Sequence, residues 1–410
     1  MPKDSTKTDQ FIPSWLNDEF LETALKSDDV CGDLKVTSSN IVRATAAGDN
    51  YLSLIYRATV QITTRGQSEN RSLIVKCQPE GANLKEITKE YKLFDLETKM
   101  LKDVLPAMHK LLREANINFT PFSAKCLYSH CSPSLQVIVL EDLKEFGFEM
   151  AERTAGLDQD HCMLVMKKLA QFHAASLALK EKNPELLETF LDPCSKNMIT
   201  EFGKYVQQFI LGLCDEIEEK CEELKKYTGR IRKIGETVVQ RLVEGRVGKM
   251  DEFSVLTHGD SWLNNMMFCY STEDRQLLDM RMVDYQMCIW TSPAVDLLYF
   301  LNSSPAMDLL VDQEMFIEEY HRVLGETLSA LGYQHLHITL DHLNQLIESR
   351  GFYGTLSVFG IRNAVLVDDE SYVSADDGLR NDQIKCKYSK LFIESMKIQV
   401  PLMERRGWLV

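Results

Sequence analysis

Residues 256–268 read LTHGDSWLNNMMF, in which His258, Gly259 and Asp260 are followed after four residues by Asn265. The segment belongs to a short β-like region, residues 254–290, inside an otherwise helical part of the chain. A carboxylate and an amide fixed in one loop can orient a hydroxyl group and reach a bound metal ion at the same time. The segment therefore indicates a catalytic loop, and the other polar motifs are interpreted around it.

The spacing H-G-D-x4-N is related to the H-R-D-x4-N catalytic loop of protein kinases. In that loop the Asp orients the attacking hydroxyl and accepts its proton, and the Asn binds a metal ion on the transferring phosphate. The spacing predicts Asp260 as the catalytic residue and Asn265 as a metal ligand. An isolated H-G-D is usually only a turn, so this prediction depends on finding the other kinase elements in the same order.

A second motif, MRMVDYQ (280–286), places Asp284 at the end of an apolar strand and beside an aromatic residue. It resembles the metal-binding D-F-G of kinases, but Gln286 stands at the third position instead of Gly. A turn near 271–275 would let the two strands form a hairpin that brings Asn265 and Asp284 together. Two oxygen ligands together with phosphate oxygens suit Mg²⁺.

A lysine ends the apolar run LIVK (73–76), where its charge is costly unless it is paired. The helical pattern over 84–102 places Glu97 on the apolar face, so we expect a Lys76–Glu97 ion pair that positions the nucleotide phosphates. Glu90 lies on the same face and is the alternative partner.

Two weaker elements complete the kinase order. The turn AAGDNYLS (46–53), with Gly48 and Asn50, would cover the phosphates, but a single Gly is weak support. The strand VLEDL (139–143) leads into a polar connector. Its backbone at Glu141 and Leu143 would bind the adenine edge as a hinge.

The composition is that of a globular protein, with 44% hydrophobic and 26% charged residues in a chain of 410. Acidic residues number 61 and basic residues 46, and the net charge of −15 disfavours nucleic-acid binding. The 11 cysteines have no regular spacing, the first ten residues have no signal-peptide pattern, and no apolar run approaches 18 residues. We therefore expect a cytoplasmic protein without a transmembrane segment.

The pattern of periodicities predicts an α+β fold with two lobes. Residues 14–26 form an expected helix with Ser14 as its cap, and residues 34–80 and 135–140 have β-type composition. Helical spacing dominates beyond residue 157. The expected lobes are a β-rich nucleotide-binding lobe over 1–143 and a helical catalytic and substrate-binding lobe over 144–410.

The chain resembles the ecdysteroid kinase-like family, related to choline kinases and aminoglycoside phosphotransferases. The resemblance is carried by LFDLETKMLKDVLP (93–106), MVDYQMCIWTSPAVDLLYFL (282–301) and the motifs above, with Tyr285 where Phe is commoner. It implies a bilobal kinase-like fold, ATP and Mg²⁺. It also implies phosphorylation of a hydroxyl on an ecdysteroid or related apolar alcohol, in steroid metabolism or detoxification. Asp260, Asn265, Asp284, Lys76 and Glu97 match the family's catalytic, metal-binding and nucleotide-binding positions.

The acceptor pocket is expected among aromatic residues of the helical lobe. The candidates are Trp262, Trp290, Phe352, Tyr353 and Phe359, for each of which core packing is the simpler interpretation. A choline or ethanolamine kinase would instead need an aromatic cage with carboxylates. A xenobiotic-hydroxyl kinase and a ligand-binding pseudokinase stay open as alternatives, and the sequence does not predict an oligomeric state.

Three further polar sites are expected to be structural. Asp296 should brace the catalytic segment, as the resemblance also implies, and His258 should be a hydrogen-bonding residue instead of a general base. His173 faces the apolar stripe of its helix and is expected in the core. Cys126 and Cys131 lack a second ligand pair, which argues against a structural zinc site.

Overall fold

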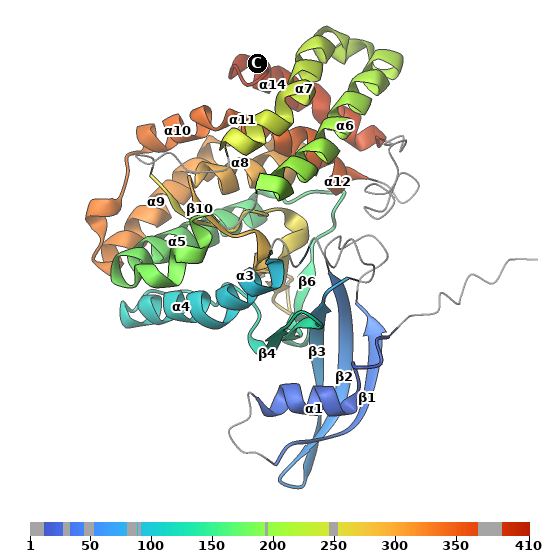
Figure 1. Ribbon diagram of the computed structural model, residues 1–410. Coiled ribbons are helices and arrows are strands. Elements are labelled where there is room, and N and C mark those ends of the chain that lie inside the picture. The colour runs from blue at the N-terminus through green and yellow to red at the C-terminus, as the bar shows by residue number, and fades with distance from the viewer. Residues whose placement is uncertain are drawn as a thin grey trace, which may run out of the picture. The chain divides into compact units, whose positions relative to one another are not determined.

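The computed structural model describes residues 12–27, 33–44, 53–79, 88, 92–192, 196–245, 253–367 and 388–410. Gly48 and Asn50 lie outside these residues. By its contacts the chain divides into two compact units (Figure 1), one of 1–89 with 124–145 and one of 90–123 with 146–410. This division differs from the predicted boundary at residue 143 mainly because residues 90–123 cluster with the helical unit.

The first unit contains a five-stranded antiparallel sheet in the order β1-β2-β3-β5-β4. Its strands are β1 (Lys35–Arg43), β2 (Leu54–Thr64), β3 (Gln67–Cys77), β4 (Cys126–Cys131) and β5 (Gln136–Glu141). The β2–β3 turn uses Arg65 and Gly66 at φ values of 50° and 78°, which suits a two-residue hairpin. Strand β5 is followed by the short helix η2 (Leu143–Phe146).

Alternate residues of β2 are buried, namely Tyr56, Ala58, Val60 and Ile62, and they form a core with helix α1 (Asp18–Lys26). The N-cap of α1 is Asn17, whose Oδ1 accepts a hydrogen bond from the Phe20 backbone at 3.0 Å. The prediction of Ser14 as the cap was therefore wrong, because the chain between Ser14 and Asn17 forms a turn before the helix begins.

The second unit is mostly helical. Its long helices are α4 (Leu105–Glu114), α5 (Gln159–Lys182), α6 (Lys196–Lys220), α7 (Thr228–Gly245), α8 (Ala294–Ser303), α9 (Glu314–Leu331), α10 (Leu340–Ser349) and α14 (Lys390–Arg405). The shorter helices and turns are α3 (Leu93–Lys99), η1 (Met100–Val104), η3 (Pro184–Phe190), η4 (Glu222–Tyr227), η5 (Leu263–Asn265), η6 (Tyr285–Met287), η7 (Met307–Leu309), η8 (Gln334–Leu336), α11 (Gly351–Leu356), η9 (Ser357–Ile361) and α12 (Arg362–Leu366). None of the described helices is long and apolar enough to cross a membrane.

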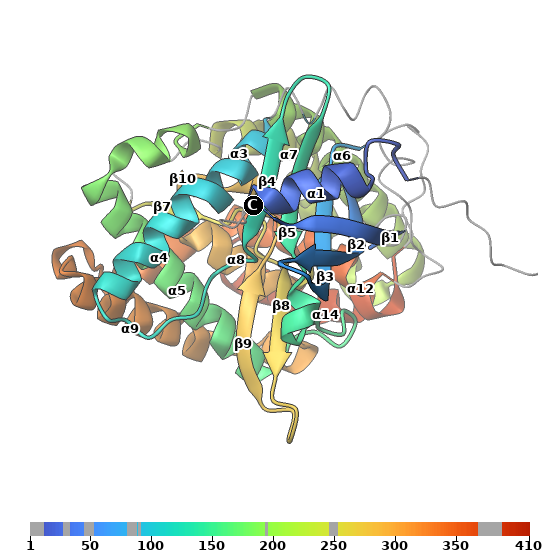
Figure 2. The same cartoon turned by 90° about the horizontal axis from the view of Figure 1, so that it is seen from below.

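Helix α5 is central to this unit. Most of its residues between Cys162 and Leu179 are buried, and the helix contacts α4, α9 and strand β7 (Figure 2). His173 lies on its buried side with no exposed surface, and its ring hydrogen-bonds Tyr320 and Asp296. The prediction of a satisfied core histidine is confirmed.

Two small sheets carry the polar motifs. Strands β6 (Phe148–Met150), β8 (Met266–Tyr270) and β9 (Leu277–Met282) form one, and β7 (Val255–Thr257) pairs with β10 (Ile289–Thr291) in the other. Strands β8 and β9 run side by side (Figure 2) with Met266 opposite Met282, so the predicted hairpin is confirmed. The hairpin turns at Ser271, whose backbone N–H donates to Gln276.

Candidate active site

The predicted catalytic loop begins where β7 ends and turns sharply at Gly259. This residue has a φ of 79°, in the left-handed region that favours glycine. A Cβ atom at this position would lie 2.1 Å from the carbonyl oxygen of Met287. Glycine is therefore required twice, by the backbone conformation and by the close approach of η6.

Asp296, near the N-terminus of α8, holds this turn through hydrogen bonds. Its carboxylate accepts hydrogen bonds from the backbone N–H of His258 at 2.7 Å and of Gly259 at 2.9 Å, and its carbonyl accepts one from Ser261 Oγ at 3.0 Å. Burial raises the pKa of Asp296, but hydrogen bonds and charge from His173 and the loop outweigh it and hold the pKa low. The predicted bracing role is confirmed.

The carboxylate of Asp260 is held at both oxygens by neutral donors. Oδ1 accepts a short hydrogen bond from the Tyr299 hydroxyl, and Oδ2 accepts one from Asn265 Nδ2 at 2.7 Å. Burial raises the pKa of Asp260 to about 6, the charge of Asp284 adds to this, and the two hydrogen bonds only partly offset it. At neutral pH the carboxylate is ionised but is a stronger base than an exposed aspartate.

The side chain of Asn265 has a defined orientation. Its Nδ2 donates to the Asp260 carboxylate and also to the Asp260 carbonyl at 3.0 Å. The opposite orientation would direct an amide oxygen at a carboxylate oxygen, so the hydrogen-bond pattern fixes the nitrogen on that side. The oxygen Oδ1 is thereby left on the other side of the amide, where it can act as a ligand.

Asp284 is adjacent to Asn265 through the backbone, because Val283 N–H donates to the Asn265 carbonyl at 2.9 Å. Its φ of 67° and ψ of 66° are unusual for a non-glycine residue and cost energy. Residues strained in this way are often found at functional sites. Gln286 Nε2 donates to the Asp284 carboxylate at 3.2 Å, while Gln286 Oε1 is buried and has no hydrogen-bond partner among the described residues.

His258 is buried and has a structural environment. Its Nε2 donates to the Val283 carbonyl at 3.1 Å, and its ring lies 4.8 Å from the Tyr285 ring. Burial lowers the pKa of His258, so the ring is neutral at physiological pH. The Nε2 hydrogen bond ties the catalytic loop to the segment that carries Asp284, as expected of a structural residue.

A second network supports the segment around Asp284 from the opposite side. The Tyr285 hydroxyl and the Met282 N–H both donate to the Phe122 carbonyl, at 3.0 and 2.8 Å. The chain near Phe122 is itself held by the buried Lys168, whose ammonium lies 2.9 Å from the Asp279 carboxylate and donates to the Thr120 carbonyl at 3.1 Å. No sequence motif predicts this support, because its residues come from three separate segments of the chain.

The predicted nucleotide-binding residues lie in both units. Lys76 is buried near the end of β3, and Glu97 is buried in α3 of the other unit, so their pairing stays a prediction. At the predicted hinge, Glu141 Oε1 accepts a hydrogen bond from the Lys125 backbone at 2.9 Å, and Leu143 is buried in η2.

The segment of the predicted hinge also contains an ion pair that was not predicted from the sequence. The buried Asp142 carboxylate accepts hydrogen bonds from Arg57 Nε at 2.6 Å and Ser72 Oγ at 2.7 Å. Burial raises the pKa of Asp142, but these contacts outweigh it and the pKa is lowered. The connector is thereby fastened to two strands of the sheet.

The aromatic candidates have different surroundings. Trp262 lies between Asp260 and Asn265, and its buried Nε1 forms no hydrogen bond to the described residues. Lys180 lies 5.6 Å from the Trp290 ring, and Arg241 lies 4.1 Å from the Phe352 ring.

The remaining two candidates lie on one helical segment. Tyr353 is half-buried in α11, which packs against α8, and its ring lies 6.1 Å from that of Phe352. Phe359 is fully buried in η9, which agrees with the simpler interpretation of core packing.

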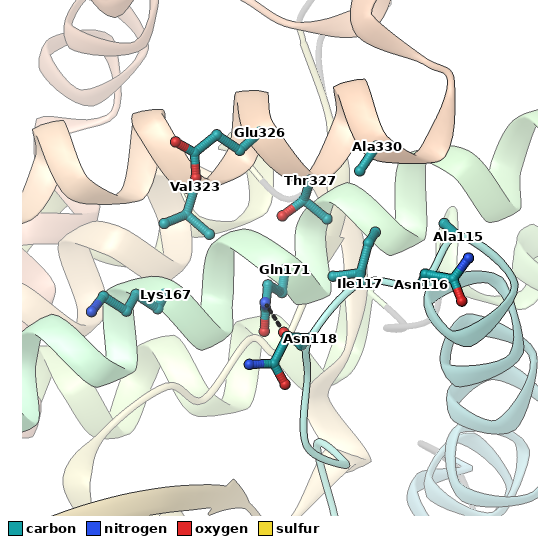
Figure 3. A pocket seen from close by; sticks show the side chains of 10 residues that line it. All are labelled: Ala115, Asn116, Ile117, Asn118, Lys167, Gln171, Val323, Glu326, Thr327 and Ala330. Atoms are coloured by element: carbon teal, nitrogen blue, oxygen red, sulfur yellow. Dashed lines mark hydrogen bonds between the residues drawn. The ribbon is translucent and has the colours of Figure 1, made fainter.

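A separate pocket of about 360 Å³ lies between the end of α4, α5 and α9 (Figure 3). One wall is closed by a hydrogen bond from Gln171 Nε2 to the Asn118 carbonyl at 3.2 Å, and Lys167 and Glu326 lie along the α5 and α9 sides. None of its lining residues was predicted as a site residue.

Sequence reasoning missed Tyr299. It lies one helical turn beyond Asp296 on α8, so both side chains project from the same face toward the catalytic loop. That spacing was a usable signal once Asp296 had been given a bracing role.

A model of the ecdysteroid kinase-like family matches residues 47–333, which is more than half of the chain. The chain belongs to the ecdysteroid kinase-like family. The two units, one a β-sheet and one mainly helical, have the make-up of its kinase-like bilobal fold. Membership supports a small-molecule kinase with an alcohol acceptor and implies the use of ATP.

No curated protein sequence matches the chain. Among solved structures, ethanolamine kinase from Plasmodium vivax is similar, with a TM-score of 0.44 and 14% sequence identity over 90% of this chain and 85% of that one. The motifs from LIVK (73–76) to MRMVDYQ (280–286) lie within the range that the family model matches. No group of three or more His, Cys, Asp or Glu side chains suited to a metal ion occurs in the described part of the chain.

Proposed function

We propose that this protein transfers the γ-phosphate of ATP to a hydroxyl of an apolar alcohol, with ecdysteroids as the leading substrate class. The observation that carries the proposal is the Asp260 carboxylate, ionised at neutral pH and held at 2.7 Å by the amide of Asn265. A general base and a metal-binding amide fixed in contact are what phosphoryl transfer to a hydroxyl needs.

Asp260 is the proposed catalytic residue. Its carboxylate would accept a hydrogen bond from the acceptor hydroxyl and take its proton as the bond from the hydroxyl oxygen to the γ-phosphorus forms and the bond from that phosphorus to ADP breaks. A pKa near 6 suits this task, because the group is charged at pH 7 and still basic enough to accept a proton. The sharp turn at Gly259 and the hydrogen bond from the Gly259 N–H to the Asp296 carboxylate would hold the loop in place.

Asn265 and Asp284 are the proposed Mg²⁺ ligands. The donor set fits a hard cation, since it offers Asn265 Oδ1, the Asp284 carboxylate and the nearby unpartnered oxygen of Gln286. The charge of Asp284 raises the pKa of Asp260, which indicates a local excess of negative charge that a divalent cation would relieve. When bound, Mg²⁺ would neutralise the charge on the transferring phosphate.

The remaining nucleotide contacts are proposed from the sequence order. Lys76, paired with Glu97, would align the phosphates, and the turn with Gly48 and Asn50 would cover them. The backbone of Glu141 and Leu143 would bind the adenine edge. The fastening of Asp142 to Arg57 and Ser72 supports a firmly held connector at this position.

The acceptor would pack against Trp262, Trp290, Phe352 and Tyr353. A specific observation favours a neutral alcohol over choline at two of these rings. Lys180 and Arg241 already lie 5.6 and 4.1 Å from the Trp290 and Phe352 rings, so a quaternary ammonium group would meet like charge there. A flat apolar alcohol has no such penalty.

The test is incubation of the protein with Mg·ATP and separate acceptors, namely ecdysone, a hydroxylated xenobiotic, ethanolamine and choline, followed by mass spectrometry for the gain of one phosphate. We expect transfer to ecdysone or to the xenobiotic, abolished in Asp260→Asn. Transfer to choline alone would refute the acceptor class. Binding of Mg·ATP in calorimetry without transfer to any acceptor would favour a pseudokinase.

A further inference from the structure

We propose that Tyr299 is a positioning residue whose hydroxyl fixes the Asp260 carboxylate in the orientation that receives the acceptor hydroxyl. This inference rests on the proposed function, because it assigns Tyr299 a part in the same phosphoryl transfer. Its basis is the direct hydrogen bond from the Tyr299 hydroxyl to Asp260 Oδ1.

The two hydrogen bonds on Asp260 come from opposite sides of the site. Asn265 Nδ2 donates to Oδ2 from within the catalytic loop, and Tyr299 donates to Oδ1 from helix α8. The terminal torsion of an aspartate is broad, so a carboxylate held at one oxygen alone can rotate. With both oxygens held, the carboxylate plane is fixed, and each oxygen still has a lone pair for the acceptor hydroxyl.

The donor is carried on a rigid support. Helix α8 already holds the catalytic loop through Asp296, and the hydroxyl of Ser304, directly after the helix, accepts a hydrogen bond from the Leu263 N–H at 3.0 Å. At its far end, the buried Arg362 donates to the Ser303 carbonyl at 2.9 Å. Tyr299 thus lies between two fixed points of the helix, and its hydroxyl position is set by the same element that sets the loop.

A neutral phenol is also the suitable kind of donor. A lysine or arginine in its place would form an ion pair with Asp260. That ion pair would lower the basicity that the carboxylate needs to accept the proton of the acceptor hydroxyl. The Tyr299 hydroxyl orients the carboxylate without cancelling its charge. Burial and the neighbouring Asp260 both raise the pKa of Tyr299 well above its usual value, so the hydroxyl keeps its proton.

The first test compares Tyr299→Phe with the wild type in two assays, ATP hydrolysis without acceptor and phosphate transfer to ecdysone. Misplacement of a reacting group by about 1 Å can reduce a rate roughly 100-fold. We expect the kcat of phosphate transfer to ecdysone to fall about 10- to 100-fold in Tyr299→Phe. The KM for ATP and the calorimetric Kd of Mg·ATP should change less than about twofold. The matched control is Tyr388→Phe, which likewise removes a single tyrosine hydroxyl. That hydroxyl donates to the Phe209 carbonyl at 2.8 Å. The kcat of this variant should stay unchanged.

The second test asks whether Tyr299 acts through Asp260. In an Asp260→Asn background, the further change Tyr299→Phe should lower the residual rate less than twofold, because the carboxylate that it orients is gone. A full 10- to 100-fold loss in that background would overturn the proposal, as would an unchanged kcat in the single Tyr299→Phe variant.

These outcomes separate the inference from the proposed function. If the wild type transfers phosphate and Tyr299→Phe does so equally well, only the positioning role is wrong. If the wild type neither hydrolyses ATP nor phosphorylates any acceptor, the proposed function is wrong and the positioning role is refuted with it. Thermal unfolding of each variant confirms that a lost rate is not lost folding.

Discussion

Replacing Asp260 by Asn should make the free protein more stable at neutral pH while it abolishes catalysis. The folded-state pKa of about 6 lies above the ordinary value of 3.8, so folding favours the protonated carboxyl group. The ionised group therefore lowers stability, with a cost that grows as the pH rises from about 4 to about 6 and is constant above it.

The magnitude follows from the pKa difference. A shift of about two units corresponds to a cost of about 3 kcal/mol at pH 7.5, which falls to about 1 kcal/mol at pH 4.5. An asparagine at position 260 can still accept from Tyr299, but its amide nitrogen would face Asn265 Nδ2, at a cost of about 1 kcal/mol. We expect Asp260→Asn to be about 2 kcal/mol more stable than the wild type at pH 7.5 and nearly equal to it at pH 4.5.

The assay is urea unfolding followed by tryptophan fluorescence at both pH values, without nucleotide or metal. The control is Asp296→Asn, since this buried carboxylate has a lowered pKa and accepts hydrogen bonds from His258 and Gly259. The Asp296→Asn change should lower the free energy of unfolding by roughly 2–4 kcal/mol at pH 7.5. A less stable Asp260→Asn at pH 7.5, or a stability difference that is the same at both pH values, would refute the reasoning.

Three further outcomes are expected. Asp284→Ala should weaken the calorimetric affinity for Mg·ATP at least about tenfold while metal-free ATP binds as before, and equal Mg·ATP affinity would contradict its role as a ligand. Gly259→Ala should lower the free energy of unfolding by about 3 kcal/mol or more, because its φ is 79° and the new Cβ would lie 2.1 Å from the Met287 carbonyl oxygen. Asn17→Ala should cost about 1 kcal/mol in urea unfolding and Ser14→Ala almost nothing; the reverse order would contradict the assignment of the cap.

The parts of the site that the sequence predicted are those encoded locally. The strands on either side of the turn near residue 271 are apolar and short, so the β8–β9 hairpin and the adjacency of Asn265 to Asp284 follow from neighbouring residues. The bracing role of Asp296 was also predictable, because a carboxylate at a helix N-terminus can accept hydrogen bonds from the backbone N–H groups of a neighbouring loop.

The parts that escaped prediction depend on contacts between distant segments. Tyr299 is 39 residues from Asp260 in the chain, and its periodicity on α8 is that of an ordinary half-buried residue. Likewise, the cap of α1 is decided by where the preceding turn ends, and propensity alone does not distinguish Ser14 from Asn17. Spacing shows which side chains share a face, but it does not show which distant group that face meets.

The buried Asp296 and the half-buried Asp260 have different roles in the proposed site. Asp296 accepts hydrogen bonds from the loop and from His173, and its environment lowers its pKa, so its charge stabilises the fold. Asp260 accepts hydrogen bonds from the neutral side chains of Tyr299 and Asn265 and lies near the like charge of Asp284, and its environment raises its pKa. Fully compensating Asp260 would stabilise the protein but would remove the basicity that the proposed reaction uses. The opposite pKa shifts of two aspartates on one short loop and helix are therefore the physical reason to expect chemistry at Asp260 and support from Asp296.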